Sequence, residues 1–115
     1  MSMSLKVIFA KVSKHLIKQN AKSRDSDGDC VYRDPQGQSC AIGCLIPEDR
    51  YESSFEGELL RDNKDVQHVL KHAIGVNSKK RAAKIELLMS LMAVHDEFEP
   101  DEWETELAAV EMTYL

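Results

Sequence analysis

The sequence contains no long run of apolar residues, and this shortage excludes two classes of protein. No stretch approaches the roughly 20 consecutive apolar residues that span a bilayer, so we expect no membrane partner. Lysines interrupt the apolar residues of the N-terminal stretch, which is unlike a signal peptide. At the same time, 43% of the residues are hydrophobic and 30% are charged, unlike a disordered chain. With no internal repeat or second boundary evident, we expect one domain over residues 1–115.

Cysteine is scarce, and the count of three is odd. Without an export signal we expect the protein to stay in a reducing cytoplasm, where Cys30, Cys40 and Cys44 are free thiols. Structural zinc sites favour two close cysteine pairs, and only Cys40 and Cys44 form such a pair. We therefore predict no metal and no cofactor. His68 and His72 share a helix face, but nothing in the sequence supplies a third ligand, so we expect them to be exposed.

Each end of the chain lacks charge of one sign. The first 22 residues contain five lysines and no acid, whereas residues 95–115 contain eight acids and no Lys or Arg. The acidic end would repel a nucleic-acid backbone, so general nucleic-acid binding is disfavoured. The lysine row is either a solvated surface or a docking face for an acidic partner.

Hydrophobic periodicity predicts a mainly α (α+β) fold with about four helices. An apolar stripe runs from Leu5 to Leu16 at helical spacing, and a helix apolar on most sides contains Leu88 and should be central. Ser78 is the predicted cap of that central helix. The predicted helices cover residues 4–22, 63–74, 78–96 and 100–114.

The segment after the first helix predicts a short β-hairpin over residues 30–43. Asp34-Pro35-Gln36-Gly37 has the composition of a type I turn, and strand-forming residues precede it. This register places Tyr32 opposite Ser39, although a slip of one residue would exchange the two faces. Residues 51–61 remain ambiguous.

The candidate binding residues lie where the first helix should meet this hairpin. His15 and Gln19 are one helical turn apart, and the hairpin should bring Tyr32 and Arg33 beside them, with His95 as a further member. An arginine fork on a short hairpin can grip an anionic group. The alternative is that these side chains only satisfy local hydrogen bonds and that the acidic last helix is the working surface.

No motif in the sequence assembles a catalytic site. A glycine-rich phosphate loop, G-x-S-x-G, H-E-x-x-H and a paired-carboxylate motif are all absent. We therefore expect no catalytic residue, although a small enzyme that pairs Cys40 or Cys44 with His15 or His95 stays open as a second alternative.

Three blocks of the sequence resemble a family of small uncharacterised proteins of tailed bacteriophages and prophages. The blocks are HLIKQNAKS, CVYRDPQGQSCAIGCLIP with Tyr51 and Glu56-Gly57 after it, and LLMSLMAVHDEFEPDEW. The resemblance implies an accessory factor in the host cytoplasm. We expect a non-catalytic binder of a host protein, in host takeover or anti-defence. The alternative is a protein that sequesters a small anionic, nucleotide-like signal near the hairpin.

Overall fold

The chain folds mainly into α-helix, in a computed structural model that describes residues 3–58, 60–75 and 80–115. The α-helices of the described residues are α1 (Leu5–Gln19), α2 (Lys64–Ile74), α3 (Arg81–Glu97) and α4 (Trp103–Tyr114). Single turns of 3₁₀ helix lie between them, at Gly43–Leu45, Glu48–Arg50, Ser53–Phe55, Leu60–Asp62 and Pro100–Glu102. None of the helices in these ranges is long and apolar enough to cross a membrane.

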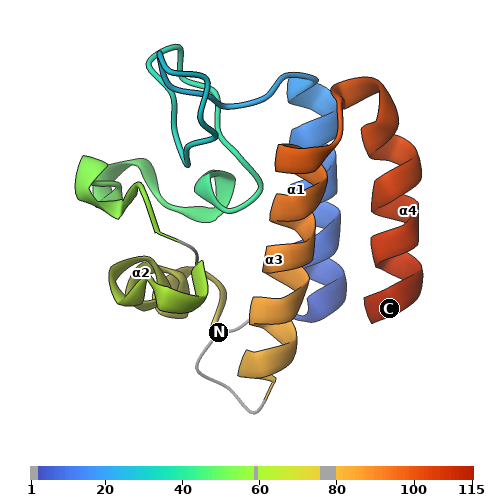
Figure 1. Cartoon of the computed structure of the whole chain (residues 1–115). Helices are drawn as coiled ribbons and strands as arrows, with labels where there is room; N and C mark the ends of the chain where they lie inside the picture. Colours follow the sequence, from blue (N-terminus) through green and yellow to red (C-terminus); the bar gives the residue numbers. More distant parts are fainter. Residues whose placement is uncertain (1–2, 59, 76–79) are drawn as a thin grey trace.

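Helix α3 is the centre of the packing. It contacts both α1 and α4, which run antiparallel to each other, while the loop segment and α2 lie on the other side of α3 from α4 (Figure 1). Leu87, Leu88 and Leu91 of α3 are completely buried. A helix that is apolar on most sides needs such a position, because each face then packs against another element.

The helix ends follow local capping chemistry. Asn20 takes a left-handed conformation (φ 51°) and its N–H closes on Leu16, so α1 stops at Gln19 and not at residue 22. Asn63 accepts the Val66 N–H and caps α2. The predicted cap of α3, Ser78, lies outside the described residues.

The predicted β-hairpin over residues 30–43 is wrong, because the described residues contain no β-strand. Arg33 and Ser39 form an isolated antiparallel bridge, one residue out of the expected register. Side chains from elsewhere take the backbone groups that a ladder would use. Gln19 accepts the Ser39 N–H at 3.0 Å and donates to its C=O at 2.8 Å. Glu56 accepts the N–H groups of Tyr32 and Arg33 at 2.9 and 3.3 Å.

Two similar turns follow each other in this part of the chain, one just before the predicted hairpin and one inside it, and they form an internal repeat that we did not expect from the sequence. In each turn an aspartate Oδ1, of Asp25 or Asp34, accepts the N–H groups two and four residues later, at 2.8 to 3.0 Å. The glycine three residues after each aspartate has a positive φ, 87° at Gly28 and 85° at Gly37, which favours glycine. Each turn is closed by one bridge, Arg24 with Cys30 and Arg33 with Ser39. These turns bring Cys30, Val31 and Tyr32 to the side of α3 on which residues of both segments line one pocket.

Candidate functional site

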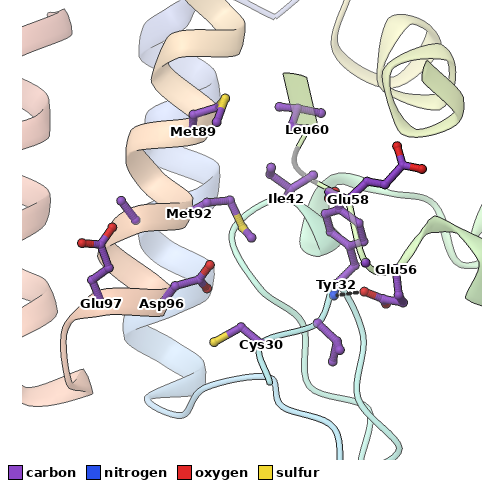
Figure 2. A pocket seen from close by; sticks show the side chains of 13 residues that line it. Cys30, Tyr32, Ile42, Glu56, Glu58, Leu60, Met89, Met92, Asp96 and Glu97 are labelled. Carbon is purple, nitrogen blue, oxygen red and sulfur yellow. Dashed lines mark hydrogen bonds between the residues drawn. The ribbon is translucent and has the colours of Figure 1, made fainter. Parts of the chain in front are cut away.

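A pocket of about 490 Å³ opens between this loop segment and α3 (Figure 2). Its apolar wall comes from Ile42, Leu60 and the α3 side chains Met89 and Met92. Methionine is flexible and polarizable, so this wall can adapt to apolar groups of different shape. The remaining lining residues are Cys30, Val31, Tyr32, Glu56, Gly57, Glu58, Ala93, Asp96 and Glu97.

The charged side chains in the described lining are all acidic, and one lysine, Lys22, lies next to the lining with its Nζ 3.3 Å from the Asp96 C=O. Glu56 and Glu58 belong to the loop side, and Asp96 and Glu97 to the end of α3. In the view of Figure 2 the Asp96 carboxylate points into the gap between the two sides, whereas the carboxylates of Glu58 and Glu97 point away from it. None of the described lining residues is Lys, Arg or His. A concave surface lined by one sign of charge concentrates the field of these carboxylates, so it attracts cations and repels anions.

Tyr32 forms part of the pocket wall and is held from both ends. Its hydroxyl donates to the Glu58 C=O at 3.2 Å, and its N–H donates to Glu56 at 2.9 Å. Burial raises the pKa of the Tyr32 hydroxyl to about 12, so the ring stays neutral at physiological pH. The predicted site residue Tyr32 therefore does line a pocket.

Glu56 connects the pocket to a second aromatic side chain. Besides the two backbone N–H groups, its carboxylate accepts the Tyr51 hydroxyl at 2.6 Å. Burial is the largest cause that raises the pKa of Tyr51, and this contact with Glu56 is the next largest. A carboxylate with three donors is held rigidly, so Glu56 orders the wall of the pocket.

Arg33 lies outside the pocket lining and is already engaged. Its Nη2 donates to the Ile46 C=O at 2.6 Å, and its guanidinium carbon lies 5.5 Å from the centre of the Tyr51 ring. This arginine fork therefore joins the loop to the segment after the Gly43–Leu45 turn, instead of projecting towards a ligand.

His15 and Gln19, one helical turn apart, both contact the backbone of Ser39. Ser39 and these two side chains lie outside the described pocket lining. His15 Nε2 is 2.9 Å from the Ser39 C=O, and Gln19 grips the N–H and the C=O of the same residue. Both side chains thus attach the second turn to α1. His15, Gln19, Tyr32, Arg33 and His95 are not brought together around one cavity.

His95 is completely buried and lies outside the described pocket lining. Its Nε2 accepts the Ser23 N–H at 2.9 Å, and its Nδ1 lies 2.6 Å from Asp96 Oδ1. Because a backbone N–H can only donate, Nε2 carries no proton in this arrangement, and Nδ1 donates to Asp96. The ring also stacks on Trp103, with the ring centres 5.6 Å apart. His95 therefore orients Asp96, which faces the pocket.

Cys30, His95 and Asp96 are the one group among the described residues with the side chains and spacing for a metal ion. Their ligand atoms lie within 4.8 Å of one another. A metal on Nδ1 would move the ring proton to Nε2, where the Ser23 N–H already donates, and a metal on Nε2 would displace that N–H. Only Cys30 and Asp96 could bind without breaking the Ser23–His95 hydrogen bond, too few ligands for a zinc site.

The surroundings of the three cysteine thiols favour the protonated form. Burial, and then the carboxylate of Asp96, raises the pKa of Cys30. Burial also raises the pKa of Cys40, and that of Cys44 to about 12. A nucleophilic cysteine needs the opposite shift and a free base. His15 and His95 are both occupied by backbone groups, so the arrangement does not supply a nucleophile–base pair.

We expect the purified protein to contain three free thiols and no bound zinc. The physical reasons are the raised pKa values of the thiols and the hydrogen bonds that occupy His95. Elemental analysis of protein purified without a chelator, with thiol titration after denaturation, measures both properties. Zinc at one equivalent, or fewer than three titratable thiols, would contradict this prediction.

Most residues of the pocket were not among the predicted site residues. Asp96 and Glu97 were noted only as part of an acidic end, and Met89 and Met92 only as part of an apolar helix. Their spacing of three or four residues on α3 gave a weak signal, because core helices show the same pattern. Comparison of the chain with protein-family models, with curated proteins and with solved structures found no match.

Proposed function

We propose that this protein is a non-catalytic binding protein that receives a positively charged side chain of a partner protein in the acidic pocket. The observation that carries this proposal is the composition of the lining: its described residues include four acids and no cationic side chain, together with an apolar wall. Lysine and arginine have a long apolar stem and a charged tip. The stem would pack on Met89 and Met92, and the tip would lie near Asp96, with Glu58 and Glu97 at the edges of the pocket.

The proposed partner is a host protein. The resemblance to small proteins of tailed bacteriophages motivates this choice, and it also motivates the proposed location in the host cytoplasm. A basic side chain presented by a folded protein can dock with little loss of entropy, because its neighbours already hold it in place. On this proposal the protein covers a functional basic residue of the host and so acts as an inhibitor or an anti-defence factor.

Two other functions are weaker proposals. A nucleotide-like signal would bring phosphate charge into a pocket lined with carboxylates, and Arg33, the candidate anion grip, is bound to the Ile46 carbonyl. A small Cys/His enzyme would need a thiolate and a free imidazole, and neither is favoured by the pKa directions or the hydrogen bonds above.

We expect a blocked peptide, acetyl-Gly-Arg-Gly-amide, to shift the methyl NMR signals of Met89 and Met92. The same peptide with citrulline, which has the shape of arginine without its charge, should shift them much less. Replacing both Glu58 and Glu97 by Lys should weaken binding of the arginine peptide about tenfold, which corresponds to about 1.4 kcal/mol. A titration followed by NMR gives each dissociation constant.

The matched control replaces Glu48 and Glu52 by Lys, since these exposed acids lie outside the described pocket lining and the change in net charge is identical. This control should bind the arginine peptide within about twofold of the unaltered protein. Equal binding of the arginine and citrulline peptides would contradict the proposal. So would binding that survives the change at Glu58 and Glu97 but is lost on charge reversal at Glu104 and Glu111, which would assign function to the acidic last helix.

A further inference from the structure

The large hydrophobic side chains most exposed among the described residues gather on two neighbouring helices. Val7 and Ile17 of α1 are 50% and 46% exposed, and Met112 and Leu115 at the end of α4 are 87% and 51% exposed. Helices α1 and α4 contact each other and run antiparallel (Figure 1). Exposed apolar side chains on adjoining helices can contribute to an interaction surface.

The charges on the same two helices are of opposite sign. Every charged residue of α1 is a lysine, and every charged residue of α4 is a glutamate. Lys14 and Glu111 are both exposed. Among the residues that the structure describes, no ion pair joins the α1 lysines to the α4 glutamates, so each row is available to a partner.

We propose that the outer face of α1 and α4, formed by Val7, Lys14, Ile17, Glu104, Glu111 and Met112, is the contact surface of a symmetric dimer of this chain. In a two-fold contact, α1 of one copy lies on α4 of the other, and the reverse contact is made at the same time. The lysine row of each copy then faces the glutamate row of its partner, with the apolar side chains between them. A second copy is the occupant that carries both complementary rows.

The size of this face fits a weak dimer. Helices of 15 and 12 residues are about 22 and 18 Å long, and two packed helices present a face about 20 Å wide. This face has an area of about 400 Å² per copy, so a dimer would bury about 800 Å² in total, below the roughly 1,200 Å² at which stable protein interfaces begin. We therefore expect association at micromolar concentrations that depends on salt, because the charge rows are exposed.

The dimer leaves the acidic pocket open. The described lining of the pocket includes no residue of α1 or α4. Each dimer would therefore present two pockets, which strengthens binding to a partner that has two basic sites. Dimer formation and the binding of a basic side chain rest on different residues, so either can fail alone.

Sedimentation equilibrium of the full chain, from about 10 to about 500 µM, tests the proposal. We expect a monomer–dimer equilibrium whose dissociation constant rises several-fold between about 50 and about 500 mM salt. Lys14→Glu alone and Glu111→Lys alone should each weaken the dimer at least about fivefold, by placing like charges in contact. The double variant restores opposite charges across the interface and should return the dissociation constant to within about twofold of the unaltered protein.

Two further variants complete the test. Met112→Asp places a charge in the apolar part of the contact and should give a monomer, while Glu48→Lys, far from both rows in the sequence and exposed, should leave the equilibrium unchanged. A protein that is monomeric at every concentration would overturn the proposal. A dimer that survives both single charge reversals and Met112→Asp would also overturn it, because the chain would then associate through another surface.

Discussion

Trp103→Ala is expected to lower the free energy of unfolding by about 3 to 5 kcal/mol. Trp103 is the largest completely buried side chain among the described residues, and its ring stacks on His95. Its Nε1 also donates to the Phe98 C=O at 3.0 Å, which fixes the start of α4 against the end of α3. The substitution removes these contacts and leaves a cavity. Chemical denaturation followed by circular dichroism measures the loss.

The matched variant is Trp103→Phe, which keeps an aromatic ring beside His95 but loses the Nε1 hydrogen bond. It should cost less than Trp103→Ala, since most of the buried apolar surface remains. Glu48→Ala, at an exposed side chain outside the acidic pocket and the proposed dimer surface, should change the free energy of unfolding by less than about 0.5 kcal/mol. A loss below about 1 kcal/mol for Trp103→Ala would show that the packing of α4 on α3 contributes little to stability.

Gly43→Ala is expected to cost roughly 3 kcal/mol or more, or to prevent folding. A Cβ atom at this position would lie 1.9 Å from the Tyr32 carbonyl oxygen and 2.7 Å from its carbonyl carbon. Both are backbone atoms, so the obstruction cannot be relieved by a change of rotamer. The loop segment would have to move away from the Gly43–Leu45 turn, and Tyr32 would move with it. We therefore expect a loss of stability and a change in the acidic pocket together.

Gly37→Ala separates this close contact from the general cost of replacing glycine. Gly37 has φ 85°, but no atom lies within 4 Å of its added Cβ. Its substitution should cost about 1 to 2 kcal/mol, through backbone conformation alone. Thermal and chemical unfolding of the two variants compare the effects. An equal loss at Gly37 and Gly43 would contradict the close approach of Gly43 to Tyr32.

The aspartate turns explain why the loop segment was only partly predictable. Asp34, Pro35 and Gly37 indicated a turn, and the Gly37 N–H does donate to the Asp34 C=O at 3.2 Å. Strand pairing after the turn depends on groups distant in the sequence. Gln19 and Glu56 bind the backbone of Ser39 and Tyr32, and no local pattern signals that a side-chain amide or carboxylate will replace a neighbouring strand.

The candidate site, like the loop segment, combines features that local sequence predicts with features that depend on distant residues. The pairing of His15 with Gln19 could be predicted because both lie on one helix, one turn apart. The pocket could not be predicted, because its described lining comes from residues far apart in the sequence, 30–32, 42, 56–58, 60, 89, 92, 93, 96 and 97. His95 was predicted as a further member of the binding group, but the position of its ring proton depends on the Ser23 N–H, 72 residues away in the sequence.

The sequence by itself determined the helical character of this protein, the central place of the helix around Leu88 and the turn at Asp34. These features follow from helical periodicity and from contacts within about four residues, which a linear pattern records directly. The tertiary structure alone decided that the loop segment forms turns in place of a hairpin, that an acidic pocket lies beside α3, and which nitrogen of His95 carries the proton. Each of these depends on which distant donor or acceptor meets a given backbone group, and that choice is made only when the helices pack.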